Sequence, residues 1–229
     1  MIMKRVIDFL RRLEANNNRE WFMEHKAEYK EVQAWFNSFA EELIRLIGEW
    51  DETVKGLTVK DCTYRIYRDV RFSKDKSPYK THMGVYVCRG GKKSGFSGYY
   101  FHIGTGGEGY PGAHMLAAGD YCAESKVLKV LREDIAMGEG DFEDIVKRQV
   151  DQHFTMDDTY KMKRLPKGLP ENSPWEEYMK YKVYCLVYEP GDEYVLAPDL
   201  AHRVSEMFKT TKPFIDYINR AIEYVREEG

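Results

Sequence analysis

Basic side chains crowd into one short segment of a chain whose overall formal charge is −3. Ten basic and three acidic residues lie between Lys60 and Lys93, so this segment alone carries +7 and the rest of the chain carries −10. So steep a local excess of charge repels itself unless an anion offsets it. The segment therefore predicts a site for a phosphate, a carboxylate or a nucleic-acid backbone.

Six residues of this segment have the side chains that such a site requires. Guanidinium groups form forked pairs with phosphate and carboxylate oxygens, lysines add point charges, and a carboxylate can orient the guanidiniums. The predicted ligand-binding residues are Arg65, Arg68, Asp69, Arg71, Lys76 and Lys80. His82 is the candidate proton carrier at the rim, because an unperturbed imidazole titrates near neutrality. Tyr79, also at the rim, is the second catalytic candidate, and it either bonds a substrate oxygen or simply packs.

We predict a strand over Cys62–Arg68. If the chain stays extended as far as Phe72, the strand and its continuation position these groups. Alternation places Arg65 and Arg71 on the outward face and sends the apolar side chains, Phe72 included, toward a core. Arg68 then falls among apolar neighbours, where an unpaired guanidinium is costly. Either Arg68 is paired, or the strand bends and brings the three arginines to one mouth.

The residues that follow this strand predict an exposed turn or short loop. Pro78 blocks a central strand and biases Ser77 away from a helix. A loop with several lysines beside an Arg-lined strand could act as a clamp or lid over a bound anion.

Two other interpretations of the segment stay open. The arginines and aspartates could form a structural ion-pair network, because charge clusters also occur where nothing binds. Alternatively, the basic residues interleave with aromatic rings, as in nucleic-acid-binding modules with stacking surfaces. A pI near 6.1 opposes a long polyanion and favours a compact anion. A small anionic ligand, with phosphorylated compounds among the candidates and either bound or turned over, is therefore the leading hypothesis, and nucleic acid is the second.

The same segment resembles a known bacterial family of conserved hypothetical proteins, domain of unknown function 2461. That family is marked by Arg-x-x-Arg-Asp-x-Arg-Phe leading to Asp/Asn-Lys-x-x-Tyr. The matching residues are Arg65, Arg68, Asp69, Arg71, Phe72, Asp75, Lys76 and Tyr79. The similarity extends through Asn17-Asn-Arg-Glu-Trp-Phe22, the Gly90-Gly-Lys-Lys turn and Pro166-Lys-Gly168. The resemblance covers most of the chain and implies that the segment matters, but it implies no particular activity.

Other motifs carry less weight. The glycines from Gly104 to Gly109 match G-x-G-x-x-G, but no helix follows to receive a pyrophosphate, so a flexible hairpin loop is the expected structure. The turn at Gly90 lacks the first glycine of a P-loop. The six histidines show no metal-ligand spacing, although His102 and His114 could meet across neighbouring strands. We therefore expect no metal and no cofactor.

Periodicity along the chain predicts a single α+β domain, mainly an antiparallel sheet flanked by long N- and C-terminal helices. A short first helix precedes Asn16, and a long second helix begins after a cap at Asn17 or Asn18. Further strands are expected at Met83–Arg89, Gly98–Gly104, Ala113–Ala118 and Tyr181–Tyr188. Further helices are expected at Glu124–Met137, Asp141–Val150, Pro198–Lys209 and Lys212–Glu227, the last two divided by Thr211-Lys-Pro213.

The bulk composition predicts a soluble cytoplasmic protein with no membrane partner. No run of eighteen apolar residues exists, and the N-terminal residues have the pattern of an amphipathic helix instead of a signal peptide. The four cysteines are far apart in sequence, as expected of buried free thiols. The sequence leaves the oligomeric state open.

Overall fold

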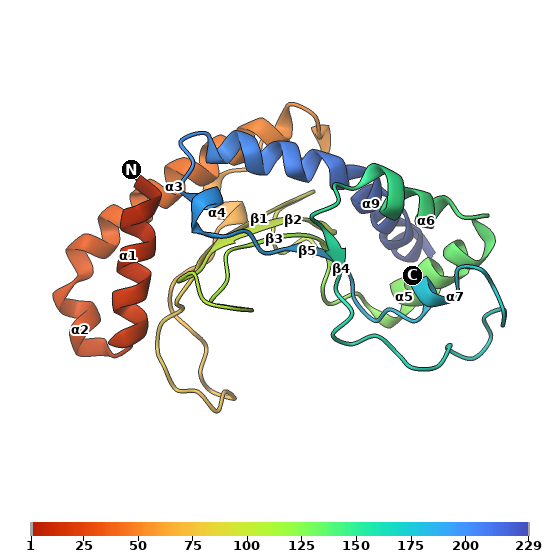
Figure 1. Cartoon of the computed structure of the whole chain (residues 1–229), viewed down its shortest axis with the longest axis horizontal. Helices are drawn as coiled ribbons and strands as arrows, with labels where there is room; N and C mark the ends of the chain where they lie inside the picture. Colours follow the sequence, from red (N-terminus) through yellow and green to blue (C-terminus); the bar gives the residue numbers. More distant parts are fainter. Residues whose placement is uncertain (1, 229) are drawn as a thin grey trace. The chain divides into compact units, whose positions relative to one another are not determined.

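The computed structural model describes residues 2–228 (Figure 1). The helices before the first strand are α1 (Ile2–Ala15), α2 (Arg19–Glu24), α3 (Lys26–Gly48), the 3-10 turn η1 (Glu52–Val54) and α4 (Val59–Cys62). The strands are β1 (Met83–Cys88), β2 (Gly98–Ile103), β3 (Met115–Asp120), β4 (Thr155–Met156) and β5 (Tyr184–Tyr188). The remaining helices are α5 (Ser125–Met137), α6 (Asp141–Asp144), the π turn η2 (Ile145–Gln149), α7 (Glu176–Met179), α8 (Asp192–Val195) and α9 (Leu200–Glu228).

Within residues 2–228, five strands form an antiparallel sheet in the order β1-β2-β3-β5-β4. At its edge, Thr155 and Met156 of β4 pair with Val187 and Leu186 of β5. The predicted α+β fold class is confirmed, as are four of the predicted strands. Strand β4 was not predicted, because two residues leave no alternation to detect.

The chain divides into two compact units. The first comprises residues 2–94, Tyr100–Leu116 and Glu189–Glu206. The second comprises Gly95–Tyr99, Ala117–Tyr188 and residues 207–228. The sequence predicts that the whole chain folds as a single domain, and this stays a prediction. A single cooperative unfolding transition would support it.

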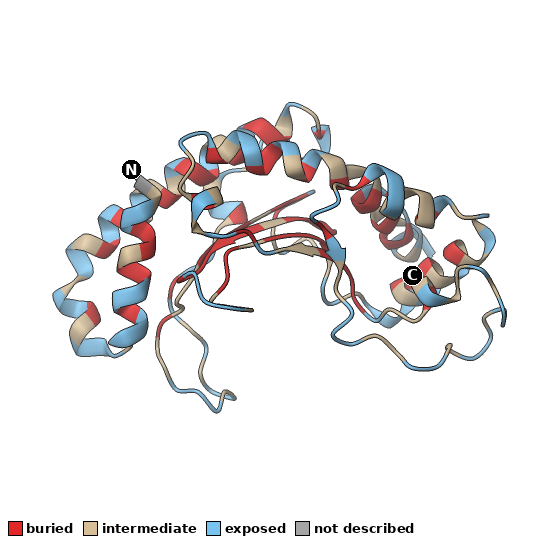
Figure 2. Ribbon diagram, in the orientation of Figure 1, coloured by how far each residue is buried: buried red, intermediate tan, exposed pale blue. Residues whose placement is uncertain are grey.

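Helices α1 and α3 supply most of the apolar core of the first unit. Apolar residues at helical spacing give each helix one buried face, which Figure 2 shows in red along α1. On α3, the Phe39 ring lies 5.2 Å from the Phe101 ring of β2, so this helix packs on the sheet. The fully buried residues on these two helices include Val6, Phe9, Leu10, Leu13, Val32, Ala40, Leu43 and Ile47.

The long second helix expected from the sequence is interrupted at His25. The Asn18 side chain accepts a hydrogen bond from the Trp21 amide, which confirms the predicted cap and begins α2. The helix stops one turn later, where His25 Nδ1 contacts the Trp21 carbonyl oxygen at 2.8 Å and the two rings stack at 4.0 Å. α3 then begins at Lys26. The apolar stripe continues through the break, which is why periodicity alone did not indicate it.

The predicted strand at residues 62–68 is wrong. Thr58 and Asp61 form a capping box that begins the single turn of α4. The Thr63 hydroxyl then bonds the Val59 carbonyl oxygen and closes that turn. Within residues 62–68, Thr63 forms an isolated bridge with Val85 and Tyr67 forms one with Tyr79. Local side-chain hydrogen bonds therefore replace a sheet ladder here.

In the second unit, aromatic rings surround Phe142, which is 2% exposed. Its ring centroid lies 5.2–5.8 Å from the rings of Tyr178, Tyr184, Phe214 and Tyr217. This cluster links α6 and α7 with β5 and the C-terminal part of α9, and it is the aromatic centre of this unit.

The two predicted closing helices are one continuous helix, α9, with Pro213 inside it. Proline removes a backbone donor and costs about 3 kcal/mol in a helix interior. The Thr210 and Thr211 hydroxyls bond the carbonyl oxygens of Met207 and Phe208, both at 2.8 Å. The rings on either side of the proline, at positions 208 and 214, are completely buried. Each burial contributes about 2–3 kcal/mol, so the packing outweighs the proline.

Candidate functional site

The basic segment forms a projecting loop of residues 66–80, here called the basic loop, which Figure 1 draws in gold away from the strands. Its two arms run antiparallel, with a bridge between Tyr67 and Tyr79. The Arg68 amide donates to the Pro78 carbonyl at 2.9 Å, and the Lys80 amide donates to the Ile66 carbonyl at 2.8 Å. Pro78 has no amide to extend the ladder, so pairing stops there and the tip is irregular.

Tyr79 anchors the foot of the basic loop to the N-terminal helices. The Asn17 side chain brackets its backbone, accepting from the Tyr79 amide at 3.1 Å and donating to its carbonyl at 2.9 Å. The Phe22 ring stacks on the Tyr79 ring at 3.9 Å. Tyr79 is only 4% exposed, so it lies in the core instead of at the rim that the sequence predicted.

The sequence left two possibilities for Arg68: a partner for its guanidinium, or a bend in the strand. The structure shows that Arg68 has a partner. Its guanidinium forms an ion pair with Asp75 and a longer contact of 3.4 Å with the Ser73 hydroxyl. The same Asp75 carboxylate accepts from the amide and hydroxyl of Ser77. These bonds hold the pKa of Asp75 well below its usual range. The charge on Arg68 is therefore balanced within the loop.

Three other predicted ligand-binding residues also bond within the basic loop. The Arg71 guanidinium pairs with both oxygens of Asp69, at 3.0 and 2.7 Å. The Lys76 ammonium donates to the Val70 carbonyl oxygen at 2.9 Å. The Arg71 side chain is 77% exposed, so this ion pair stands in solvent. Phe72, expected in the core, is 96% exposed, because the irregular tip does not continue the alternation of a strand.

Arg65, Lys80 and His82 line a shallow pocket at the foot of the basic loop, here called the basic pocket. Its other lining residues are Tyr29, Tyr64, Ile66, Met83 and Gly84. Its water-accessible volume is about 10 Å³, which is room for about one water molecule. No carboxylate lines it. The pocket is thus a small cationic depression with an aromatic side.

The two cations of the basic pocket, Arg65 and Lys80, repel each other, and no carboxylate lines the pocket, although the charge of Arg65 contributes to the lowered pKa of Asp69. Among the described residues, Arg65 forms no hydrogen bond or ion pair. The Lys80 ammonium lies 5.2 Å from the centre of the Tyr64 ring. Burial, and then the positive charge of Arg65, lower the pKa of Lys80. An anion placed between them would relieve that repulsion.

His82 is a neutral imidazole on the wall of the basic pocket. Burial first, then the nearby His102 and the cations Lys80 and Arg68, lower its pKa to about 3. Its Nε2 lies 3.4 Å from the Tyr110 hydroxyl, a long hydrogen bond. Its Nδ1 is buried and has no hydrogen-bond partner among the described residues. A buried ring nitrogen of this kind is costly until a ligand or water bonds it.

His102 and His114 both have structural partners, and the structure shows no metal cluster between them. His102 Nε2 lies 2.8 Å from the Ala113 carbonyl, and its Nδ1 lies 3.1 Å from the Tyr100 hydroxyl. Burial lowers the pKa of His102 to about 4, so this ring is neutral as well. In residues 2–228, no group of three or more histidine, cysteine or acidic residues is placed to hold a metal ion.

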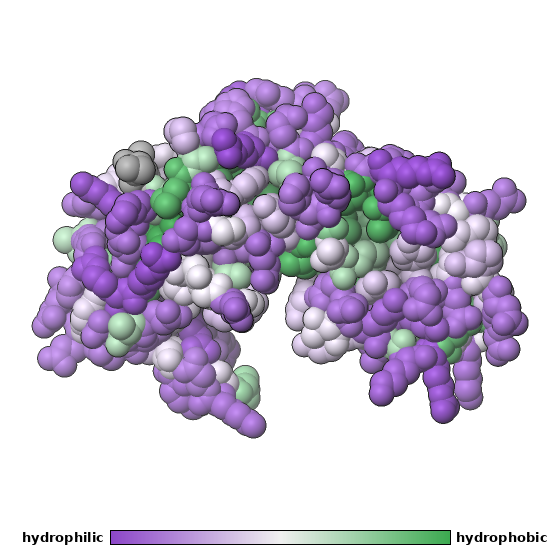
Figure 3. Space-filling view, viewed as in Figure 1, coloured by the Kyte–Doolittle hydropathy of each residue, from purple (hydrophilic) through white to green (hydrophobic). Residues whose placement is uncertain are grey.

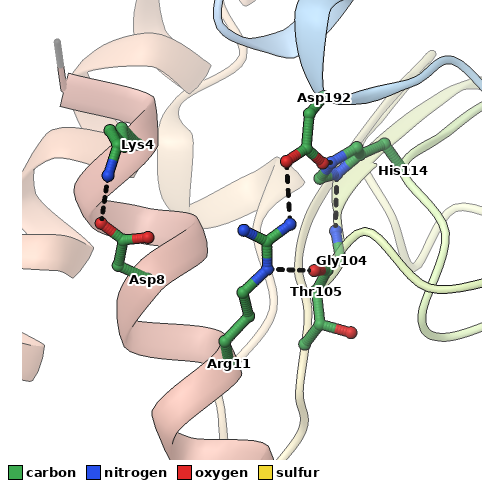
Figure 4. Close-up of polar contacts among 7 residues, drawn as sticks. All are labelled: Lys4, Asp8, Arg11, Gly104, Thr105, His114 and Asp192. Carbon is green, nitrogen blue, oxygen red and sulfur yellow. Dashed lines mark hydrogen bonds and ion pairs between the residues drawn. The ribbon is translucent and has the colours of Figure 1, made fainter.

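His114 belongs to a second polar cluster of Arg11, Gly104, Thr105, His114 and Asp192 (Figure 4). We call it the buried polar network after its buried histidine, although the side chains of Arg11 and Asp192 are 45% and 40% exposed. The Gly104 amide donates to His114 Nδ1 at 3.2 Å, so the ring proton lies on Nε2 and is donated to Asp192 at 3.0 Å. Arg11 donates to the other oxygen of Asp192 at 2.8 Å and to the Thr105 carbonyl at 2.6 Å. His114 is 1% exposed. Each strong donor and acceptor of the imidazole is used, which leaves this ring no free nitrogen for chemistry.

Comparison with known proteins decides the family. The sequence model of the conserved hypothetical protein family DUF2461 matches residues 5–217. The chain belongs to the DUF2461 family. No curated protein and no solved structure matches it. The function of this DUF2461 protein is therefore inferred from the geometry of its own residues.

Two contacts between distant residues of this DUF2461 protein, one at the basic pocket and one in the buried polar network, were not predicted from the sequence. Tyr110 lies beside His82 although 28 residues separate them, and Asp192 lies beside His114 across 78 residues. The glycine-rich stretch joins β2 to the neighbouring antiparallel strand β3, as the expected hairpin loop does, and its flexibility stays a prediction. A Cβ on Gly104 would lie 2.3 Å from the Ala113 carbonyl oxygen, so this glycine permits close backbone packing. No spacing rule indicates any of these contacts.

From the sequence we expect no membrane-spanning segment, and the helices of the structure agree with this. No helix between residues 2 and 228 of this DUF2461 protein is long and apolar enough to cross a bilayer.

Proposed function

We propose that this protein binds a small anionic ligand in the basic pocket, through a single phosphate or carboxylate group held by Arg65 and Lys80. One observation supports the proposal most directly: Arg65 and Lys80, two cations, line the same pocket, and no carboxylate lines it. Such an arrangement costs free energy in the empty protein and is stabilised by a bound anion.

The size of the basic pocket limits what enters it. A volume near that of one water molecule does not enclose a metabolite, so the anionic group is held at the mouth of the pocket and the rest of the ligand stays outside. The Tyr64 ring is 42% exposed and Tyr110 is 64% exposed, so both are available to contact that outer part. Arg65 supplies the forked donors that match phosphate or carboxylate oxygens.

His82 contributes a hydrogen bond to this site instead of a charge. With a pKa of about 3, its imidazole is neutral at physiological pH. The unpartnered Nδ1 is buried, so a water held beneath the ligand would supply its missing hydrogen bond. The proposal is therefore binding, and the geometry assigns no nucleophile and no proton transfer.

Thermal denaturation with inorganic phosphate, a sugar phosphate and a small dicarboxylate tests the proposal. A ligand at one hundred times its Kd stabilises the folded protein by about 2.7 kcal/mol, so Tm rises. Arg65→Gln and Lys80→Met should abolish this rise. Lys80→Met should also raise the Tm of the ligand-free protein or leave it unchanged, because it removes a partly buried charge beside Arg65.

Arg71→Gln is the matched control, since it removes an arginine of the same loop that does not line the basic pocket. It should keep the full ligand-induced rise. The proposal fails if none of the three compounds raises Tm, or if the rise persists in Arg65→Gln and Lys80→Met.

A further inference from the structure

Exposed aromatic rings gather on the basic loop and at its foot. Tyr67 is 48% exposed and Phe72 is 96% exposed, and Tyr64 lies just before them. Figure 3 shows the projecting loop as mainly hydrophilic, with a small hydrophobic area beside its end. Scattered apolar residues on a surface need no explanation, but three rings within nine residues of one projection do.

The basic loop holds Phe72 in solvent through its own hydrogen bonds. Arg68 pairs with Asp75, Arg71 pairs with Asp69, and the Ser73 amide contacts the Val70 carbonyl at 3.4 Å. At the foot, the bracketed Tyr79 fixes the position of the arms. These bonds order the loop around Phe72, so the backbone of the loop loses little conformational entropy when a partner covers the ring.

Cations alternate with these rings. The Arg71 guanidinium lies 6.0 Å from the centre of the Phe72 ring. The ammonium groups of Lys80 and Lys92 lie 5.2 and 5.9 Å from the Tyr64 ring. Lys74, two residues after Phe72, is exposed as well. A strip of rings with positive charges between them is the surface on which single-stranded nucleic acids bind, because bases stack on the rings and phosphates meet the cations.

We infer that the basic loop is a binding surface for single-stranded nucleic acid, with Phe72 and Tyr67 as the stacking residues. An intact duplex fits less well, because its base faces are already stacked. A lipid surface also fits less well, because charged residues separate the rings and little continuous apolar area is available. A protein partner also fits less well, because one aromatic ring is enough to anchor a loop in a protein pocket. This loop instead has several rings with cations between them, which matches the repeating bases and phosphates of a nucleic-acid strand.

This inference shares Tyr64 and Lys80 with the proposed anion site, but its two stacking residues lie outside that site. Neither Phe72 nor Tyr67 lines the basic pocket, so their substitution leaves Arg65 and Lys80 in place. The two proposals can therefore fail separately. The phosphate-induced rise in Tm reports on the pocket, and oligonucleotide affinity in Phe72 variants reports on the loop.

Fluorescence anisotropy with labelled twelve-nucleotide oligo(U), oligo(dT) and a matching duplex, in low salt and in physiological salt, tests the inference. The single strands should bind about tenfold more tightly than the duplex. Phe72→Ala should weaken binding of the single strands roughly five- to hundredfold, the range expected for losing one stacked base. Phe72→Trp should retain the affinity, and its indole fluorescence should be quenched on binding.

Tyr224→Ala is the matched control, because Tyr224 is a 54% exposed aromatic residue outside the basic segment. It should bind as the wild type does. Phe72→Ala should also melt with the wild type, because a side chain that is 96% exposed packs against almost nothing.

Three results would overturn the inference. The first is no binding of any oligonucleotide even in low salt. The second is binding that Phe72→Ala leaves unchanged and that heparin, an unstacked polyanion, competes fully, which would mean that charge alone acts. The third is Phe72-dependent binding to acidic vesicles or to a protein partner while oligonucleotides bind independently of Phe72, which would assign the loop to another class of partner.

Discussion

The basic loop and the buried polar network contain the same kinds of side chain, but these side chains have different roles in the two regions. In the loop, Arg71 and Asp69 are two residues apart and meet in solvent. In the network, Arg11 and Asp192 are 181 residues apart and meet beside a histidine that is 1% exposed. Local pairs organise a projection without attaching it to the core, whereas remote pairs join segments that the chain order separates. The network should therefore determine stability, and the loop should determine binding.

Breaking the buried polar network should have the largest effect on stability. His114→Ala leaves the Gly104 amide and an oxygen of Asp192 without partners and opens a cavity at a position that is 1% exposed. Both losses together should lower the free energy of unfolding by ~3 kcal/mol. Urea denaturation measures it, with exposed His202→Ala as the control, which should change little. A loss below about 1 kcal/mol in His114→Ala would show that the network contributes no more than a surface pair.

Acid should distinguish the buried histidines from the charges of the loop. His102 has a folded-state pKa of about 4, below the 6.5 of an unfolded chain. Above pH 6.5 neither state binds the proton. As the pH falls from 6.5 toward 4, the unfolded chain binds a proton that the folded protein does not, so stability declines. At pH 5 this one residue should cost about 2 kcal/mol, and His82, with its pKa of about 3, acts in the same direction.

The test compares the pH dependence of unfolding in the wild type and in His102→Gln between pH 7 and pH 5. Most carboxylates titrate below this window, so histidines dominate it. His102→Gln is less stable at pH 7 but should lose about 2 kcal/mol less than the wild type on going to pH 5. Parallel curves for the two proteins would mean that His102 takes up its proton in the folded state as readily as in the unfolded chain. His202→Gln, at an exposed position, serves as the control.

The same contrast explains how much of the fold the sequence indicates. Strands β1, β2, β3 and β5 were predicted because each is a short apolar run bounded by turn residues. The segment of residues 62–68 has the same sequence pattern, but it is not a strand, because local hydrogen bonds at Thr58 and Thr63 compete with strand pairing. The alternation of apolar and polar residues does not indicate such competition. The division of α9 at Pro213 was predicted from a local penalty, whereas burial of the flanking rings, which is a tertiary effect, outweighs it.

For the candidate site, sequence reasoning found what lies within one segment. Arg65, Lys80 and His82 were among the predicted residues because the excess of positive charge between positions 60 and 93 drew attention to them. The partners of Arg68 and Arg71 within the loop were not distinguished from an external anion, because composition counts charges but does not pair them. The relation of Arg11 and His114 to Asp192 depends on how distant segments meet, and it leaves no local pattern.

Removing the exposed pair of the loop should have the smallest effect, and this makes it the sharpest test of the comparison. Arg71 is 77% exposed, so its attraction to Asp69 is screened by water and salt. Arg71→Gln and Asp69→Asn should each shift Tm by less than about 2 °C, and the shift should vanish in 0.5 M salt. Differential scanning calorimetry at low and high salt measures both. A larger loss that persists in high salt would mean that the loop contributes to the stability of the fold, and the division of labour between loop and network would then be wrong. A negligible loss in stability together with weaker oligonucleotide binding by Arg71→Gln would place the role of this arginine in binding alone, because its charge would then act on a partner and not on the folded chain.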